Sequence, residues 1–176
     1  MRGLVRYAKY RGIRVVPEID SPAHSASWGI GRPDLVLRCT SSADPTGYQS
    51  LLDPSKEATW DAVAALFGEL ASVFTDEAFH LGVDEVPHDA TSCYNTTHVN
   101  EWMPTVNVSA GDYKGVVRYH IDRLQAILAS LGKRPSAWQE AADHYGLDPR
   151  LRTLLVQVQP DIEKLAVAAI NQAVQG

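Results

Sequence analysis

Two adjacent carboxylates, Asp84 and Glu85, directly follow an apolar stretch that reads as a β-strand. Neighbours on a regular strand point to opposite faces, but at the end of a strand both side chains can reach the same cleft. Two close carboxylates do not easily both stay ionised in a partly desolvated site, so the pKa of one rises. The result is a carboxylic acid beside a carboxylate, as acid catalysis of glycoside cleavage requires. The alternative is a solvated acidic turn, which is common on protein surfaces.

Further polar and aromatic side chains follow other predicted strands. Asp20 ends a short strand, with His24 in the loop behind it, and Trp138 ends another strand just before Glu140. In an α/β barrel the carboxyl ends of the strands and the loops after them form the active-site face. We therefore expect these side chains to lie at one rim with the carboxylate pair. A structural role for His24 and an ordinary core position for Trp138 are the alternatives.

The elements that must position these residues alternate between helices and strands. Apolar residues at helical spacing predict helices at residues 4–11, 53–74, 112–131 and 160–173. Strand-like runs lie between them, at residues 13–20, 78–83, 135–138 and 153–158. The intervening stretches, 21–53 and the one that carries Cys93, read as loops. Strands alternating with covering helices favour parallel βαβ units, so we predict an α/β fold with about four parallel βα units, part of a (β/α)8 TIM barrel.

Composition limits the classes of function. The 176 residues have the apolar and charged content of a globular domain and a formal net charge of −5. This mildly acidic balance, without a basic cluster, argues against a nucleic-acid partner. No apolar run approaches the roughly 20 residues of a membrane span, and no secretory signal peptide is visible at the amino terminus.

Two cysteines and two asparagine triplets bear on the compartment. From spacing alone, Cys39 and Cys93 are either unrelated thiols or a pair whose bridge would contribute about 3–4 kcal/mol to stability. Asn95 and Asn107 each begin an N-glycosylation triplet. Together these features favour an oxidising, secretory-pathway compartment.

Three ordered motifs resemble those of family 20 glycoside hydrolases, the β-N-acetylhexosaminidases. Residues 80–86, His-Leu-Gly-Val-Asp-Glu-Val, resemble the family signature His-Ile/Leu-Gly-Gly-Asp-Glu-Val. Residues 11–24 resemble the preceding family strand, Arg-Gly-Ile-Arg-Val-x-Pro-Glu-x-Asp-x-Pro-Gly-His, and residues 137–140 resemble its Trp-Gln/Glu-Glu segment. The resemblance covers nearly the whole chain.

The resemblance implies a role for each matching residue. Glu85 would be the general acid that protonates the departing glycosidic oxygen and later acts as base. Asp84 would hold the 2-acetamido group of the substrate, whose carbonyl oxygen attacks the anomeric carbon in place of a protein nucleophile. Asp20 and His24 would form a polar relay near the acid, and Trp138 would form a wall of the acetamido pocket.

Other residues receive smaller roles. Glu140 is a candidate for a polar contact to the sugar or to the catalytic residues. Strand alternation places His80 on the face of Asp84 but about 13 Å below it, which favours an interior supporting role. Cys39 and Cys93 match a pair that is bridged in animal members of the family. No metal ion or cofactor is implied.

The implied activity is removal of terminal non-reducing β-linked N-acetylglucosamine or N-acetylgalactosamine from glycans. The resemblance also allows a homodimer of the full-length protein and a lysosomal, vacuolar or extracellular location. Val83 stands where the family has glycine, and Gln159 stands where members carry a second pocket tryptophan; both changes bear on activity.

Length is the main departure from the family. A complete barrel has eight strands and about 250 residues. We therefore expect residues 1–176 to form a single domain that is incomplete at both ends. On its own, such a chain is expected to hydrolyse N-acetylglucosaminides poorly or not at all. Two alternatives are a non-catalytic carbohydrate-binding paralogue and a generic α/β protein with a solvated Asp-Glu turn.

Overall fold

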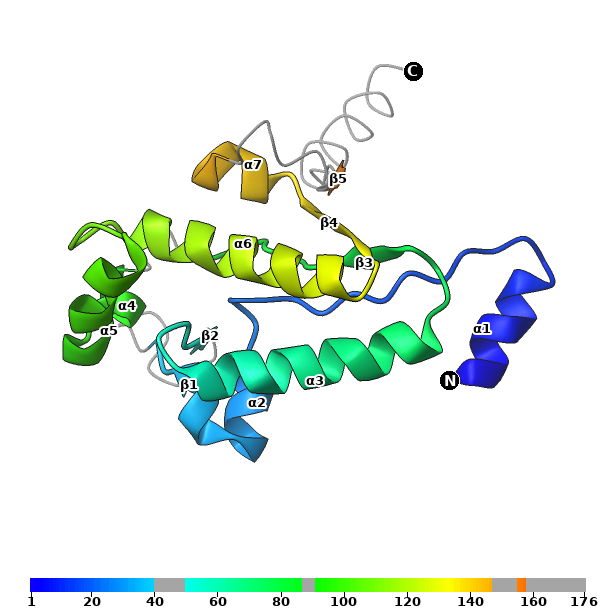
Figure 1. Cartoon of the computed structure of the whole chain (residues 1–176), viewed down its shortest axis with the longest axis horizontal. Coiled ribbons are helices and arrows are strands. Elements are labelled where there is room, and N and C mark those ends of the chain that lie inside the picture. Colours follow the sequence, from blue (N-terminus) through cyan, green and yellow to red (C-terminus); the bar gives the residue numbers. More distant parts are fainter. Residues whose placement is uncertain (40–49, 87–90, 147–154, 158–176) are drawn as a thin grey trace, which may run out of the picture.

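A three-stranded parallel sheet forms the centre of the computed structural model, which describes residues 1–39, 50–86, 91–146 and 155–157. The strands occur in the order β3-β4-β5, with bounds Ala78–His80, Arg134–Trp138 and Leu155–Gln157 (Figure 1). In their register, Phe79 pairs with Pro135 and Ala137 pairs with Val156. Helices occur between the consecutive parallel strands, so the α/β prediction is confirmed.

The segment at residues 13–20 lies beside β3 but is scarcely a strand. Glu18 forms a single parallel bridge with His80. The bridge is held by a hydrogen bond from Ile19 N to His80 O of 3.0 Å and one from His80 N to Pro17 O of 2.9 Å. The predicted strand is therefore shorter than expected. Pro17 has no N–H, which limits how far a hydrogen-bond ladder can extend through this segment.

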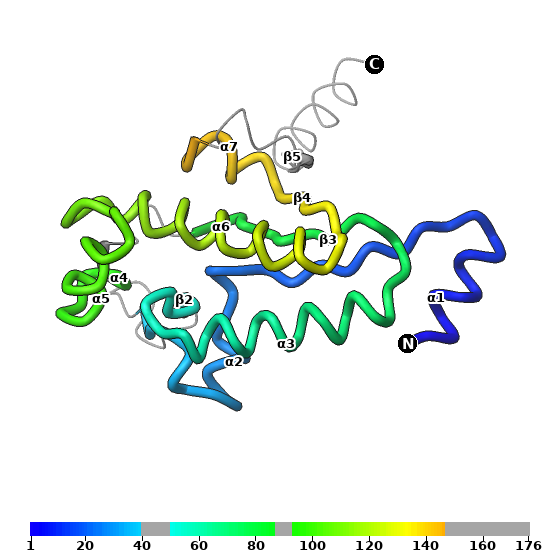
Figure 2. The backbone as a smooth tube through the Cα atoms, in the orientation of Figure 1, coloured from blue at the N-terminus to red at the C-terminus, as the bar shows by residue number. Residues whose placement is uncertain are grey.

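Two long helices cover the sheet. Helix α3 (Glu57–Val73) and helix α6 (Tyr113–Ser130) contact each other, and α6 also contacts β4. Figure 2 shows the two helices running side by side along the direction of the strands. Helix α6 begins as predicted, because the Asp112 carboxylate accepts a hydrogen bond of 2.8 Å from Gly115 N. The shorter helix α1 (Arg2–Lys9) precedes the sheet, and the shorter helix α7 (Glu140–Tyr145) lies between β4 and β5 in the chain.

The start of α3 was predicted wrongly. The sequence Asp53-Pro54 predicts a helix that begins there, but α3 begins at Glu57. The Asp53 carboxylate is buried and accepts hydrogen bonds from the Ser55 backbone N–H (3.1 Å) and hydroxyl (2.6 Å). It also accepts one from His98 (3.0 Å), which lies in a distant segment of the chain. The aspartate therefore organises a turn that precedes the helix.

The core lies between these helices and the sheet. Helix α3 buries Trp60, Val63 and Phe67, as its apolar spacing predicts, and the Phe67 ring lies 4.6 Å from that of Phe79 on β3. Helix α6 buries its own apolar face, which includes Val117, Ile121, Leu124 and Leu128. This packing fixes where the carboxyl ends of β3 and β4 lie.

The two stretches predicted as loops contain short elements. The first holds α2 (Ala26–Gly31), a 3-10 turn η1 (Pro33–Leu35), and an antiparallel pair, β1 (Val36–Leu37) with β2 (Leu51–Leu52). The second holds α4 (Thr91–Tyr94), α5 (Thr97–Trp102) and a 3-10 turn η2 (Met103–Val106). Elements this short have no periodic pattern that sequence analysis could detect.

A disulfide joins the two stretches, between Cys39 beyond β1 and Cys93 in α4. The pairing implied by the family resemblance is therefore confirmed. No helix in the described ranges is long and apolar enough to cross a membrane. The predicted helix at residues 160–173 and the predicted pocket position Gln159 lie outside the described residues.

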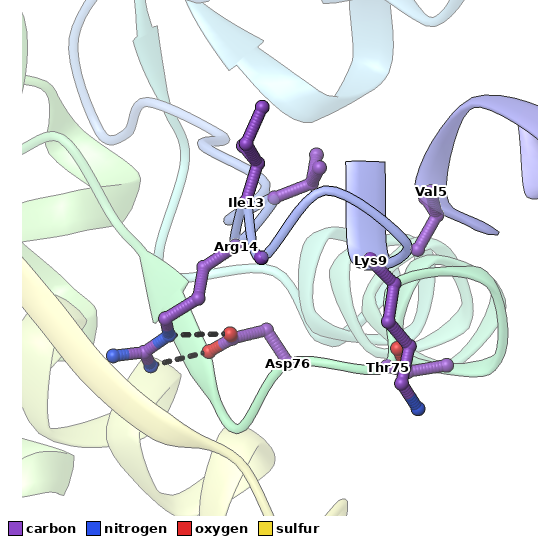
Figure 3. Close-up of a pocket in the computed structure, with 8 residues that line it drawn as sticks. Val5, Lys9, Ile13, Arg14, Thr75 and Asp76 are labelled. Atoms are coloured by element: carbon purple, nitrogen blue, oxygen red, sulfur yellow. Dashed lines mark hydrogen bonds and ion pairs between the residues drawn. The ribbon is translucent and has the colours of Figure 1, made fainter. Parts of the chain in front are cut away.

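A cavity of about 310 Å³ opens between α1 and the segment that leads into β3. In Figure 3 the side chains of Arg14 and Asp76 point toward each other, and two hydrogen bonds of 2.7 Å join them. Both residues precede the parallel segments that carry Glu18 and His80. The cavity therefore lies at the amino ends of the strands, opposite the rim where the candidate catalytic residues were predicted.

Candidate active site

The carboxylate pair lies in a turn with an unusual backbone. Gly82, Val83 and Glu85 have positive φ angles of 69°, 67° and 51°. The turn begins while the chain still pairs with β4, since Gly82 O accepts a hydrogen bond of 3.0 Å from Trp138 N. This backbone departs from the regular alternation of a strand, so Asp84 and Glu85 both lie at the carboxyl end of the sheet.

Asp20 holds this turn against the neighbouring segment. Its Oδ1 accepts a hydrogen bond of 3.0 Å from Val83 N. A Cβ atom at Gly82 would lie 2.0 Å from the same oxygen and 2.8 Å from Asp20 Cα. Glycine at position 82 is therefore required both by the positive φ and by the close approach of Asp20.

His24 links Asp20 to Glu85. Its Nδ1 hydrogen-bonds to Asp20 Oδ2, and its Nε2 lies 3.3 Å from Glu85 Oε2. The Glu85 side chain is 67% exposed, whereas that of His24 is 34% exposed. The three side chains thus run from the half-buried Asp20 through His24 to the exposed Glu85. An imidazole placed between two carboxylates can hold a proton close to the exposed carboxylate, here Glu85.

The surroundings raise the pKa of both inner groups. Burial, helped by the negative charge of Asp84, raises the pKa of Asp20 to about 6 against the opposing hydrogen bonds from His24 and from Val83 N. For His24, burial disfavours the charged imidazolium. The hydrogen bond to Asp20 and the charges of Asp20, Asp84 and Glu85 outweigh that effect and raise the pKa of His24.

Asp20 should therefore make the stability of the chain depend on pH. Its folded pKa of about 6 exceeds its ordinary value of 3.8, so the folded chain binds this proton more tightly than the unfolded chain. The stability that this proton contributes is lost as pH rises from about 4 to about 6. We expect urea unfolding at several pH values to show that Asp20→Asn loses less free energy of unfolding than the parent chain between about pH 4 and about pH 6. An equal loss in both proteins would contradict the assignment.

One carboxylate oxygen of Asp84 is available to accept a hydrogen bond from a ligand. Its Oδ1 is buried and has no hydrogen-bond partner among the residues that the structure describes. Leaving a buried acceptor without a partner typically costs about 1–3 kcal/mol, so such an atom is expected where a ligand supplies the donor. Asp20, His24 and Asp84 could also share a cation, since one ligand atom of each lies within 4.8 Å of the others.

The residues that follow β4 contact the same turn. Glu140 Oε2 accepts a hydrogen bond of 2.9 Å from Glu85 N, which places a second carboxylate against the backbone of the first. Trp138 Nε1 donates a hydrogen bond of 3.2 Å to Glu18 Oε1. The Trp138 ring also packs against that of His80, with centroids 5.0 Å apart. All six residues predicted for the rim are thus brought to it.

Glu18 was missed by the sequence analysis. It lies two positions before Asp20, so strand alternation would have placed both side chains on the same face. That signal was available, but no local pattern indicates a partner as distant as Trp138. His80 is buried, as expected for a supporting residue, and its Nδ1 accepts a hydrogen bond of 3.1 Å from Gly82 N.

Comparison with known proteins shows the family of the chain. The family model for the glycosyl hydrolase family 20 catalytic domain matches residues 1–174. The chain belongs to glycosyl hydrolase family 20. It is 38% identical over 165 residues to "Beta-hexosaminidase subunit A2" of Dictyostelium discoideum, covering 92% of this chain and 28% of that protein. It is 38% identical over 169 residues to "Beta-hexosaminidase 1" of Arabidopsis thaliana, covering 94% of this chain and 28% of that protein.

A solved family 20 structure shows the same fold. The exo β-N-acetylglucosaminidase of Vibrio harveyi, in complex with N-acetylglucosamine, superposes with a TM-score of 0.76 at 24% identity. The match covers 99% of this chain and 26% of that one. The chain thus spans little more than a quarter of the length of these family members.

The backbone at Val83 has the left-handed conformation that glycine adopts most easily. The family motif has glycine at this position, and the structure shows why, because the φ of Val83 is 67° and its side chain is fully buried. A β-branched residue in the left-handed region is a genuine outlier that costs roughly 1–2 kcal/mol. In this chain, packing of the isopropyl group in the core offsets that strain.

Two substitutions of Val83 test this strain. Both Val83→Ala and Val83→Gly remove the buried isopropyl group, but only glycine relieves the left-handed conformation. We expect the glycine variant to be more stable than the alanine variant by about 1 kcal/mol in urea unfolding. Val63 is the matched control, because it is buried inside α3, where glycine should be the less stable of the two by about 1 kcal/mol. The same order at both positions would show that Val83 is not strained.

Proposed function

We propose that this family 20 chain carries the catalytic carboxylates of a β-N-acetylhexosaminidase, which removes terminal non-reducing β-linked N-acetylhexosamine residues from glycans. The observation that carries the proposal is the pairing of two different carboxylates in one turn. Asp84 offers a buried acceptor without a described partner, and Glu85 offers an exposed carboxyl group beside His24. The names of the relatives, which are hexosaminidases, support the same activity.

In the first step, Glu85 donates its proton to the glycosidic oxygen as the bond from that oxygen to the anomeric carbon breaks. The carbonyl oxygen of the substrate's own 2-acetamido group forms a new bond to the anomeric carbon from the opposite face. Asp84 accepts a hydrogen bond from the acetamide N–H, which orients the group and stabilises the positive charge that develops on it. The Oδ1 of Asp84, which has no partner among the described residues, is the atom we assign to that bond.

In the second step, the Glu85 carboxylate removes a proton from a water molecule. The water oxygen bonds to the anomeric carbon, and the bond to the acetamide oxygen breaks, so the β configuration is retained. His24 lies 3.3 Å from Glu85, and its proton can stabilise the carboxylate form of Glu85 between the two steps. Asp20 in turn orients His24 through the bond to Nδ1.

The remaining rim residues shape and support this centre. We assign Trp138 to a wall of the pocket for the acetamide methyl group, because its half-buried indole lies at the end of β4 next to the turn. Glu140 supports the acid through its hydrogen bond to Glu85 N.

We also propose that the parallel strands belong to a (β/α)8 barrel, of which residues 1–176 form one part. The parallel sheet, the family membership and the likeness to the Vibrio structure support this architecture. A secretory-pathway location is supported by the disulfide and by the exposure of Asn95 and Asn107, both of which begin glycosylation triplets.

Titration with a thiazoline that mimics the bound form of the acetamide tests the function. We expect the 176-residue chain to bind it in calorimetry, and Asp84→Asn to weaken binding roughly 10- to 100-fold, the effect of losing a hydrogen bond to a charged group. Glu77→Gln, which changes an exposed carboxylate just before the amino end of β3, is the control and should bind normally.

The alternative, a non-catalytic carbohydrate-binding protein, predicts a different result. The observation that favours this alternative is Val83, a valine with a positive φ where the family motif has glycine. Such a protein would bind plain N-acetylglucosamine as well as the thiazoline, and Glu85→Gln would leave that binding unchanged. A chain that binds neither compound would refute both functions.

A further inference from the structure

We propose that Glu18 is a positioning residue that sets the orientation of the Trp138 indole and, through it, the fit of the N-acyl group; the second part rests on the proposed function. Glu18 Oε1 accepts a hydrogen bond of 3.2 Å from Trp138 Nε1, across 120 positions of sequence. Glu18 takes no part in the proposed chemical steps.

The sheet brings Glu18 to this place. Its bridge with His80 sets it beside β3, and His80 pairs in register with Ser136 of β4, two positions before Trp138. Side chains two positions apart on a strand share a face. Glu18, His80 and Trp138 therefore project on the same side of the sheet, at its carboxyl end.

The neighbouring imidazole does not compete for the Glu18 oxygen. Although His80 Nδ1 lies 3.3 Å from Glu18 Oε1, that nitrogen already accepts a hydrogen bond of 3.1 Å from Gly82 N. A ring nitrogen that accepts a hydrogen bond carries no proton to donate. The donor to Glu18 is therefore the Trp138 indole, and the bond is charge-assisted on the side of the carboxylate.

Three contacts then determine how the indole lies. The backbone N–H of Trp138 donates to Gly82 O, Nε1 donates to Glu18, and the ring meets the His80 ring at an interplanar angle of 67°. The first contact places the Cα atom and the other two restrict the side-chain torsions. Because the indole is only half-buried and meets the His80 ring in an edge-type contact, loss of the Glu18 contact would free the ring to adopt other rotamers.

The functional consequence concerns the size of the N-acyl group. A wall that is held in one orientation fits one acyl group and excludes larger ones, whereas a mobile wall discriminates less. Glu18 therefore determines selectivity between N-acetyl and longer N-acyl substrates without touching the substrate.

Fluorine NMR of the 176-residue chain labelled with 5-fluorotryptophan tests the positional claim without a ligand. The chain has four tryptophans, and the Trp138 resonance is assigned by its absence in Trp138→Phe. Glu18→Gln keeps an oxygen acceptor and should leave the Trp138 resonance unchanged. Glu18→Leu removes the acceptor and should shift or split that resonance while the other three stay in place.

Controls decide between a local and a general effect. Glu77→Leu removes an exposed carboxylate that pairs with Arg134 at the other end of the sheet, and it should leave the Trp138 resonance unchanged. An unchanged Trp138 resonance in Glu18→Leu would overturn the proposal. If Glu18→Leu gives the collapsed spectrum of an unfolded chain, Glu18→Ala replaces it, with the same expected and contradicting outcomes.

Paired thiazolines test the selectivity claim. Glu18→Leu should reduce the preference for the N-acetyl over the N-propionyl thiazoline about tenfold, the effect of one lost hydrogen bond, and Glu18→Gln should change it less than twofold. An unchanged preference in Glu18→Leu would overturn the selectivity role. If the parent chain binds neither compound, the proposed function fails, and the fluorine spectra alone decide whether Glu18 positions Trp138.

Discussion

Replacing Glu85 with glutamine is expected to slow cleavage of a β-N-acetylglucosaminide of a simple alcohol about a thousandfold. General acid catalysis contributes typically 10²- to 10⁴-fold, and an alkoxide is too basic to leave without a proton. The glutamine keeps the size of Glu85 and its exposed position beside His24 but has no proton to donate. The effect should be small, less than about tenfold, for a dinitrophenyl glycoside, because that leaving group departs without protonation.

A single-turnover assay with the chain in excess measures this effect. Release of the leaving group then reports bond cleavage alone, and slow turnover does not obscure it. Glu101→Gln, an exposed glutamate on α5, is the matched control and should react at the parent rate with both substrates. Equal slowing of both substrates by Glu85→Gln would mean that Glu85 is not the acid.

The gathering of residues at one rim could be predicted because it follows from two simple rules. Asp20, Asp84 and Trp138 each follow a strand-like segment, and the carboxyl ends of parallel strands meet at one edge of a sheet. The long helix α6 was equally predictable, because it has a sustained apolar face, an Asp112 cap and a glycine that ends it. A long helix whose apolar spacing, cap and end signals all lie within its own segment can therefore be predicted from the sequence.

What could not be predicted depends on contacts between distant segments. Asp53 reads locally as a helix cap, but its carboxylate also binds His98, 45 positions away, and α3 begins later. Leu51 and Leu52 form a strand of only two residues, and both are fully buried by tertiary packing. The left-handed conformation of Val83 contradicts the preference of valine for extended backbone, and the sequence analysis did not predict it.

The same distinction applies inside the candidate site. The family resemblance already implies separate roles for Asp84 and Glu85, and the structure adds that the two carboxylates differ in burial and in partners. One carboxylate has a buried oxygen with no partner among the described residues, and the other is two-thirds exposed beside an imidazole. These different surroundings support the roles proposed for the two carboxylates, an acceptor for the amide and a donor for the leaving group.

A disulfide anchors the stretch that also carries His24. Residues 21–39 contain only short elements, and the bond from Cys39 to Cys93 ties the far end of this stretch to α4. Removing the bond with Cys39→Ala and Cys93→Ala is expected to lower the free energy of unfolding by about 4 kcal/mol. The value follows from a closed loop of 54 residues, because the bond restricts the unfolded chain.

Urea unfolding of the double variant and of the parent chain, with and without reductant, measures this contribution. Both cysteines are buried, so alanine removes two sulfur atoms from the core as well as the bond. Reduced parent chain is the control for that loss, since it retains the sulfur atoms and lacks only the bond. We expect it to be nearly as unstable as the double variant. A reduced chain as stable as the oxidised one would show that the bond does not constrain the unfolded state.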